Sequence, residues 1–286
     1  MKKKYKDWII GVAFCLPFLS LFILFVLQPL VLSIVYSFFD KRVGVEPHFN
    51  GLNNFIYALN FPGFTYVFQN LLLFVIVGVN IKMVIALFLA SILNEEFKGR
   101  RIFRSLLIIP WAMPMVPSLV MWRWILDTDY GFINRLLLIL GFPQILFLGE
   151  YRWAISMAVV YHIWRSLPFY SLMLLAGMQS IPYSLYEAAE IDGASWWSKF
   201  RNVTIPLIKP VYVIATLLSL IWTLGDFTTI WILTRGGPGD TTNVFSTFAF
   251  KFAFQIGNLG AGYATFVMLL PGLFILIVAL LKVIKE

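Results

Sequence analysis

The chain has 286 residues, of which 60% are hydrophobic and only 13% are charged, and its mean hydropathy is +0.84. A soluble domain carries roughly 25% charged residues, so this composition excludes an ordinary soluble domain and predicts a membrane protein. The formal net charge of +8 is spread over several loops, which argues against a nucleic-acid partner. The single cysteine, Cys15, excludes an intrachain disulfide framework and argues against a cysteine-based metal site.

Six apolar stretches are long enough to cross a bilayer, which takes about 20 helical residues. We place them at Trp8–Phe38, Asn70–Leu93, Ser105–Leu126, Trp153–Gly177, Leu207–Leu233 and Gly262–Val283. The first run is longer than the roughly 7–15 residues of a signal-peptide core and no A-x-A site follows it, so we expect a retained helix, kinked at Pro29. The fold class expected is an all-α membrane protein with a single domain of six transmembrane helices over residues 1–286.

The distribution of basic residues predicts the orientation of these helices. If the N-terminus is cytoplasmic, the inside segments hold 13 of the 22 lysines and arginines, whereas the outside segments hold 6. Because basic residues concentrate in cytoplasmic loops, both termini are expected inside.

Prolines fall within several of the predicted spans, and each removes a backbone hydrogen bond that lipid cannot replace. They are Pro110, Pro114 and Pro117 in the third span, Pro168 in the fourth and Pro271 in the sixth. Interrupted helices are common along substrate pathways, although a simple packing kink explains any single proline equally well.

The polar segment over residues 182–206 lies between the fourth and fifth spans, on the predicted cytoplasmic side. Ser184 and Glu187 have the spacing of a capping box, so Ser184 is expected to cap a short helix. Gly193 is expected to end that helix in a left-handed turn. Trp196, Trp197 and Phe200 are expected to form an apolar face on a second short helix. By itself this pattern also fits an amphipathic connector on the membrane surface.

The same segment reads EAAEIDGASWWSKFRNVTIP from Glu187 to Pro206, and it resembles the EAA loop of permease subunits of binding-protein-dependent ABC importers. In the family this loop is the coupling helix that docks on the ATPase. The resemblance assigns coupling to six positions: Glu187, Ala188, Ala189, Asp192, Gly193 and Pro206. Where the family usually ends in I-x-L-P, this chain has Val203 and Ile205.

The resemblance extends over nearly the whole chain, through FRSLLIIPWAMPMVPSLVMWRWIL from Phe103 and LTRGGPGDTT from Leu233. These stretches are similar to sugar-importer permeases of the compact six-helix, type I form. The family implies a prokaryotic inner-membrane location and four kinds of partner: a second homologous permease, two ATPase subunits, an extracytoplasmic binding protein and membrane lipid. ATP and Mg would be used by the ATPase, and no cofactor by this chain.

Two polar stripes run along predicted helices at i, i+3, i+4 and i+7, which places each on one face. The fifth span carries Ser219, Trp222, Thr223 and Asp226, and the fourth carries His162, Arg165, Ser166 and Phe169. Polar groups beside aromatic rings suit a sugar, such as a disaccharide or oligosaccharide. By resemblance all of these except His162 and Arg165 match pathway positions, and Arg165 is a substrate-binding candidate because of its guanidinium. Two alternatives stay open: Arg165 pairs with Asp226, or Arg165 serves an anionic substrate such as glycerol phosphate.

No P-loop, H-E-x-x-H or G-x-S-x-G motif occurs, so the chain is not expected to be an enzyme or to bind nucleotide through a P-loop. His162 is expected to be a hydrogen-bonded interior residue rather than a metal ligand, and Lys82 in the second span has no partner that the sequence names. A carrier driven by an ion gradient is the main rival class, because mid-span Arg165, Asp226 and His162 could relay protons. Such a carrier has no need of an ATPase-docking loop.

Overall fold

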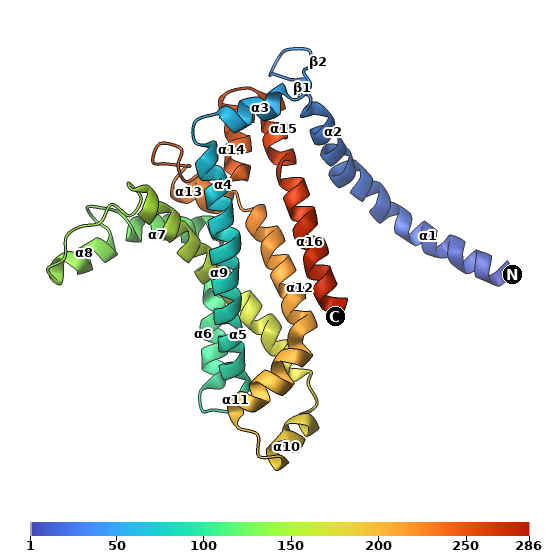
Figure 1. Cartoon of the computed structure of the whole chain (residues 1–286), viewed down its shortest axis with the longest axis vertical. Coiled ribbons are helices and arrows are strands. Elements are labelled where there is room, and N and C mark those ends of the chain that lie inside the picture. Colours follow the sequence, from blue (N-terminus) through green and yellow to red (C-terminus); the bar gives the residue numbers. More distant parts are fainter. Residues whose placement is uncertain (1, 286) are drawn as a thin grey trace. The chain divides into compact units, whose positions relative to one another are not determined.

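A computed structural model describes residues 2–285, with side chains described for residues 11–283. The fold is built almost wholly from helices (Figure 1). The helices are α1 (Lys2–Phe22), α2 (Gln28–Tyr36), α3 (Asn53–Asn60), α4 (Phe64–Leu72), α5 (Asn80–Asn94), α6 (Arg100–Ala112), α7 (Met115–Ile125), α8 (Phe132–Ile139), α9 (Tyr151–Gln179), α10 (Tyr183–Ile191), α11 (Trp196–Lys199), α12 (Ile205–Leu224), α13 (Thr228–Leu233), α14 (Phe245–Phe250), α15 (Leu259–Val267) and α16 (Leu269–Lys285).

Short π-helical segments join several of these helices without interrupting the spiral. They are Ile23–Leu27, Leu73–Val79, Phe200–Thr204 and Lys251–Gln255. The described residues contain one small antiparallel sheet, in which β1 (Phe39–Asp40) pairs with β2 (His48–Phe49).

Four continuous helical stretches in the described residues are long and apolar enough to cross a membrane: Gly11–Tyr36, Phe64–Asn94, Trp196–Leu224 and Leu259–Val283. The bent pair of α6 and α7 would make a fifth. Five of the six predicted spans therefore coincide with apolar helices. The fourth predicted span lies in α9, which has 29 residues but carries more polar side chains than the others. The count of six and the cytoplasmic termini stay predictions.

The chain divides into two compact units, and each is described by itself. The smaller unit comprises Met1–Phe61 and Phe248–Leu270. Within it, α15 packs on α2 and α3, and Tyr36 stacks on Tyr263 with ring centroids 6.0 Å apart. The Asn54 side chain donates to the carbonyls of Ser37 and Phe39 at 2.9 and 2.7 Å, which fastens α3 to the end of α2.

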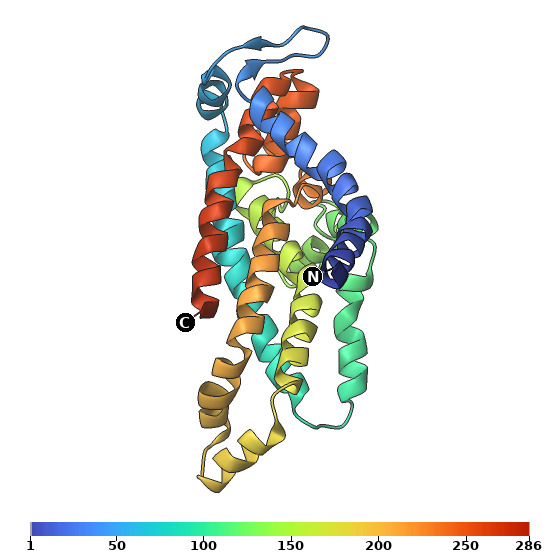
Figure 2. The same cartoon turned by 90° about the vertical axis from the view of Figure 1, so that its right-hand side faces the viewer.

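The larger unit comprises Pro62–Thr247 and Pro271–Glu286, and it holds the predicted pathway and coupling residues. Helix α9 forms its centre: both views show α9 (yellow-green) beside α5 (cyan), and α12 also packs on α9 (Figures 1 and 2). Two apolar clusters surround α9, one shared with α5 and α12 and the other with α7 and α13. The continuous helix α9 is thus the scaffold on which the interrupted helices rest.

The third predicted span, residues 105–126, is not one straight helix. Helix α6 ends at Ala112 and α7 begins at Met115, and the two are bent by 92°. Pro114 explains the break, because proline lacks a backbone N–H and disfavours a helical conformation in the residue before it. Met113 is accordingly extended, with φ −65° and ψ 138°.

The fifth predicted span, residues 207–233, is also interrupted. Helix α12 ends at Leu224, Gly225 follows, and α13 begins at Thr228. Asp226 therefore lies in the connection and does not continue the face formed by Ser219, Trp222 and Thr223, as the i, i+7 spacing predicted. Glycine ends helices readily because its backbone has the most freedom to leave the helical conformation.

Pro168 and Pro271 behave differently from Pro114. Helix α9 continues through Pro168, which is buried within it, so of the two explanations that the sequence left open the interrupted helix is wrong for the fourth span. In the sixth span, α15 and α16 meet at Met268, whose φ of −58° and ψ of −24° are still helical, so Pro271 does not break this span either. A membrane helix can contain proline where neighbouring helices pack around the freed carbonyl.

Candidate functional site

A cavity of about 430 Å³ opens in the larger unit where α9 meets the two interrupted spans. Its walls combine aromatic rings with a few charged and hydroxyl groups, which come from α5, α6, α7, α9, α12 and α13 and from the connection between the last two. The lining residues are Lys82, Trp111, Met115, Tyr161, His162, Arg165, Ser166, Tyr170, Ile221, Trp222, Gly225, Asp226, Phe227, Thr228 and Thr229. A concave site with aromatic walls and few polar groups is typical of small-molecule recognition.

Four of the seven predicted pathway residues line this cavity: Arg165, Ser166, Trp222 and Asp226. Phe169 lies behind the lining rings, in contact with Trp222. Ser219 and Thr223 are buried one layer further back and do not line the cavity. The predicted stripes thus meet at one place, although only part of them faces the open space.

Three rings from three helices form a continuous aromatic wall. Phe169 of α9 stacks on Trp111 of α6 with centroids 5.8 Å apart, and it contacts Trp222 of α12 at 5.2 Å. Trp111 and Trp222 are exposed, so their faces are open to a ligand. Such faces suit the apolar CH surfaces of a sugar ring.

Arg165 uses one end of its guanidinium to hold the bend between α6 and α7. Its Nη1 donates to the carbonyl oxygens of Pro110 at 3.2 Å and Met113 at 2.7 Å. A helix bonds each carbonyl to the N–H four residues later. For these two carbonyls residues 114 and 117 are both proline, which has no N–H. Arg165 therefore supplies the donors that the two prolines remove.

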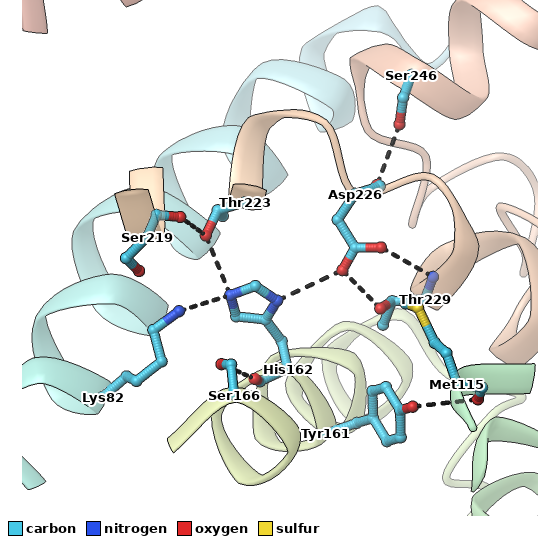
Figure 3. A network of polar contacts seen from close by, with 10 residues as sticks. All are labelled: Lys82, Met115, Tyr161, His162, Ser166, Ser219, Thr223, Asp226, Thr229 and Ser246. Atoms are coloured by element: carbon cyan, nitrogen blue, oxygen red, sulfur yellow. Dashed lines mark hydrogen bonds and ion pairs between the residues drawn. The ribbon is translucent and has the colours of Figure 1, made fainter. Parts of the chain in front are cut away.

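Asp226 has a corresponding place at the other interrupted span (Figure 3). Its Oδ1 accepts from the Thr229 amide at 3.0 Å and its Oδ2 from the Thr229 hydroxyl at 2.6 Å, so the carboxylate caps the start of α13. The same Oδ2 lies 3.4 Å from Nδ1 of His162 on α9. The carboxylate thus joins the break to the central helix.

Lys82 completes this network from α5 (Figure 3). Its side chain is 1% exposed, and Nζ lies 3.0 Å from Nε2 of His162 and 4.8 Å from the centre of the Tyr170 ring. Thr223 Oγ1 also lies 3.0 Å from Nε2, but its proton is directed to the Ser219 carbonyl at 2.6 Å. The predicted interior, hydrogen-bonded His162 is confirmed.

The direct ion pair between Arg165 and Asp226, which the sequence left open, is not among the ion pairs of the described residues. Arg165 bonds carbonyls of α6 and the bend, whereas Asp226 bonds His162 and Thr229. The helix break moved Asp226 off the α12 face, which brought it to His162. No group of three metal-ligating side chains occurs in the part of the chain described.

The coupling segment forms two short helices at one end of the larger unit (Figure 1). Gly193 has φ +75°, and the amides of Gly193 and Ala194 bond back to Glu190 and Ala189, both at 2.9 Å. This is the predicted left-handed helix end. The predicted capping by Ser184 is wrong: α10 begins at Tyr183, so Ser184 already lies in its first turn, and no side chain caps the helix at Pro182.

One ion pair joins the two short helices, and two further contacts of Trp196 hold α11 to its own helical continuation and to the end of α5. Lys199 Nζ lies 2.6 Å from Glu190 Oε1, and this bond raises the pKa of Lys199. Trp196 stacks on Phe200 at 5.4 Å, and its Nε1 donates to Glu95 Oε1 at 3.2 Å. The outer surface of α10 stays open, with Ile191 87% exposed.

The coupling positions are mostly at this surface. Glu187, Ala188, Asp192, Gly193 and Pro206 are exposed, and Ala189 is half-buried. Nothing in these contacts identifies a partner, so their coupling role is taken up below as a proposal.

Sequence reasoning missed several lining residues, among them Lys82, Trp111, Tyr161 and Tyr170. Nothing in the sequence placed Trp111 at the cavity, because the bend between α6 and α7 determines where its side chain points. For Lys82 a signal existed, since a lysine within an apolar span needs a partner. For the Arg165 contacts the signal was the proline pair, whose spacing names the two freed carbonyls.

Comparison with known proteins gives consistent matches along the chain. A family model described as "Binding-protein-dependent transport system inner membrane component" matches residues 82–284. The trehalose/maltose transport system permease protein MalF of Thermococcus litoralis is 37% identical over 94% of this chain and 92% of that protein. The lactose transport system permease protein LacF of Rhizobium radiobacter is 32% identical over 88% of this chain and 86% of that protein.

Solved structures agree on the fold. A crystal structure of a bacterial ABC transporter involved in import of the acidic polysaccharide alginate matches with a TM-score of 0.83. That match covers 99% of this chain and 96% of the other at 23% identity. A second structure of the alginate transporter, in complex with a periplasmic protein bound to an alginate pentasaccharide, matches with a TM-score of 0.81 at 22% identity.

Proposed function

Since this chain belongs to the family of binding-protein-dependent transport system inner membrane components, we propose that it forms half of the translocation pore of an ATP-driven sugar importer. It is a multi-pass protein of the inner membrane and a permease subunit, not a catalytic one. Family membership sets aside a carrier driven by an ion gradient. The observation that carries the sugar assignment is the 37% identity, over 94% of the chain, to a permease named for trehalose and maltose.

The cavity supports a disaccharide or oligosaccharide as the substrate. The rings of Trp222 and Trp111, with Phe169 behind them, offer flat apolar faces. Ser166 and the edge of the Asp226 carboxylate offer hydrogen-bonding groups beside those faces. The guanidinium N–H groups of Arg165 that do not bond the carbonyls at the α6–α7 bend can donate to the sugar. Ser219 and Thr223 are buried behind the cavity wall and support it.

The coupling proposal assigns the exposed surface of α10 to an ATPase subunit. Glu187, Ala188, Ala189, Asp192 and Gly193 would form the docking surface, and Pro206 would start α12 as the lever into the membrane. Ile191 presents its apolar side chain on this same surface, where a docked ATPase subunit would cover it.

The assembly proposed has a second homologous permease, two ATPase subunits and an extracytoplasmic binding protein. The arrangement further proposed is a six-span domain with both termini in the cytoplasm. ATP binding closes the ATPase pair, which moves the coupling segments and opens the pore toward the loaded binding protein. Hydrolysis, with Mg, takes place on the ATPase, and this chain supplies no cofactor site.

To test this function, native membranes are solubilised gently and the chain is purified by an affinity tag together with the proteins bound to it. Co-purification of an ATPase and a second permease, together with ATP-dependent uptake of a labelled disaccharide into reconstituted vesicles, is expected. Glycerol phosphate uptake instead, which the sequence left open, would keep the importer class and overturn the sugar. A chain that purifies without an ATPase would overturn the importer assembly.

A further inference from the structure

Two residues of α9, one helical turn apart, each contact a different interrupted span at the cavity. Arg165 bonds the carbonyls of Pro110 and Met113 at the α6–α7 bend. His162 lies 3.4 Å from Asp226 in the α12–α13 connection. We propose that His162 and Arg165 are positioning residues through which α9 holds the two helix breaks at the cavity, with Lys82 as the counter-charge of Asp226.

The Arg165 side of the proposal follows from the backbone. Pro114 and Pro117 cannot donate to the carbonyls four residues before them, and lipid offers no replacement. Both carbonyls lie within bonding distance of one guanidinium nitrogen, at 3.2 and 2.7 Å. Tyr161, one turn earlier on α9, reinforces the contact through Ser118 at 2.7 Å. The charge of Arg165 is therefore directed first at the protein's own chain.

The His162 side follows from hydrogen-bond bookkeeping. A lysine ammonium can only donate, so the ring nitrogen facing Lys82 accepts and Nδ1 carries the proton toward Asp226. Thr223 does not compete for this acceptor, because its hydroxyl proton is given to the Ser219 carbonyl. A neutral imidazole thus links a cation on α5 to an anion at the α12–α13 break (Figure 3).

The proposal predicts that loss of Arg165 loosens only the α6–α7 bend and that loss of His162 loosens only the α12–α13 connection. Cysteine labelling can report on each break separately. Met115 marks the α6–α7 bend and Thr228 the α12–α13 connection, and both line the cavity. Each is replaced by cysteine, in turn, in a chain that carries Cys15→Ser. The rate of reaction with a membrane-permeant maleimide is then measured on the full chain in native membranes.

Arg165→Leu is expected to raise the labelling rate of Met115→Cys about tenfold, as for the loss of a hydrogen bond from a charged group. The same variant leaves Thr228→Cys within about twofold of its starting rate, because the sites have no shared partner. His162→Leu gives the opposite pattern. His162→Gln keeps one acceptor and one donor, and it is expected to return Thr228→Cys toward the wild-type rate. Arg152→Leu, an exposed arginine on the same helix, is the matched control.

Unchanged labelling in both leucine variants would overturn the proposal and leave these residues as ligand contacts only. An equal rise at both reporters would also overturn it, because that indicates general loosening. If Arg165→Leu fails to accumulate, Arg165→Met decides, because it keeps an unbranched side chain without a donor: a rate raised at Met115→Cys alone supports the proposal, and a wild-type rate rejects it. His162→Gln behaving as His162→Leu would reject the bridge. Labelling needs no sugar, so a failed transport assay leaves this result unaffected.

Discussion

The cavity and the coupling segment both contain charged residues, but they use them differently. In the cavity, Lys82, Arg165 and Asp226 all bond groups of the same chain. In the coupling segment, Glu187 and Asp192 are exposed, and Ile191 presents an apolar side chain to solvent. A substitution in the cavity should therefore act first on the fold, whereas one on the outer surface of α10 should act first on assembly.

The largest effect is expected from Lys82→Met, which leaves Asp226 without its counter-charge in a buried setting. Removing one member of a buried charge pair costs about 3–5 kcal/mol. The midpoint of thermal unfolding in detergent should fall strongly, and Lys82→Met/Asp226→Asn should recover part of the loss because the double variant is neutral. Lys98→Met, at an exposed lysine after α5, is the control. If Lys82→Met and Lys98→Met unfold at the same midpoint, the charge network does not stabilise the fold.

A smaller loss of stability, with a large loss of coupling, is expected from Gly193→Val. Its φ of +75° costs a residue with a side chain about 1–2 kcal/mol, while no atom lies near enough to clash with a new Cβ. Transport per inserted chain should fall, and stimulation of ATP hydrolysis by the loaded binding protein should be lost. Gly193→Asn, which tolerates this conformation, should keep most activity. Normal transport in the valine variant would contradict the coupling role.

A slight loosening of α10 against α11 is expected from Lys199→Met, which removes the bond to Glu190. Because that bond raises the pKa of Lys199, its contribution is complete below the ordinary lysine pKa of about 10.4 and disappears as pH rises through the raised value. The difference between wild type and variant in protease sensitivity of the segment should thus be constant from about pH 6 to 8. A difference that changes across this window would point to another group.

The smallest effect on the fold is expected from Ile191→Asp, since exposed positions usually change stability by no more than about 0.5 kcal/mol. Co-purification of the ATPase should nevertheless fall sharply, because a charge would replace the apolar contact. Together with Lys82→Met, this variant separates the two regions most clearly. If the ATPase is retained at wild-type levels, α10 docks by another face.

The sequence predicted the broad architecture because apolar runs of spanning length and the EAA pattern are local signals. Five spans and the Gly193 turn were found in this way. The helix breaks at Met113 and Gly225 were harder, because whether a proline or glycine interrupts a membrane helix depends on the neighbours that satisfy the freed carbonyls. Pro168 shows this dependence from the other side, since α9 continues through it.

The site was found in part for the same reason. Helical periodicity placed Arg165, Ser166 and Trp222 at the cavity, but it also assigned Asp226 to a face that ends at Leu224. Contacts between distant segments, such as Lys82 with His162, have no periodic signature. Spacing from Pro114 and Pro117 would have named the carbonyls that need a donor, although not the residue that provides it.

The link between Arg165 and the two prolines also has a consequence for how the chain is made. Ribosomes add about 5–20 residues per second, and Arg165 follows Pro117 by about fifty residues. For several seconds the carbonyls of Pro110 and Met113 must find another donor, such as water in the insertion channel. The bend between α6 and α7 can reach its final form only when α9 arrives beside it. Because the fourth span is synthesised after the third, the third span completes its bend only once the fourth span is in place.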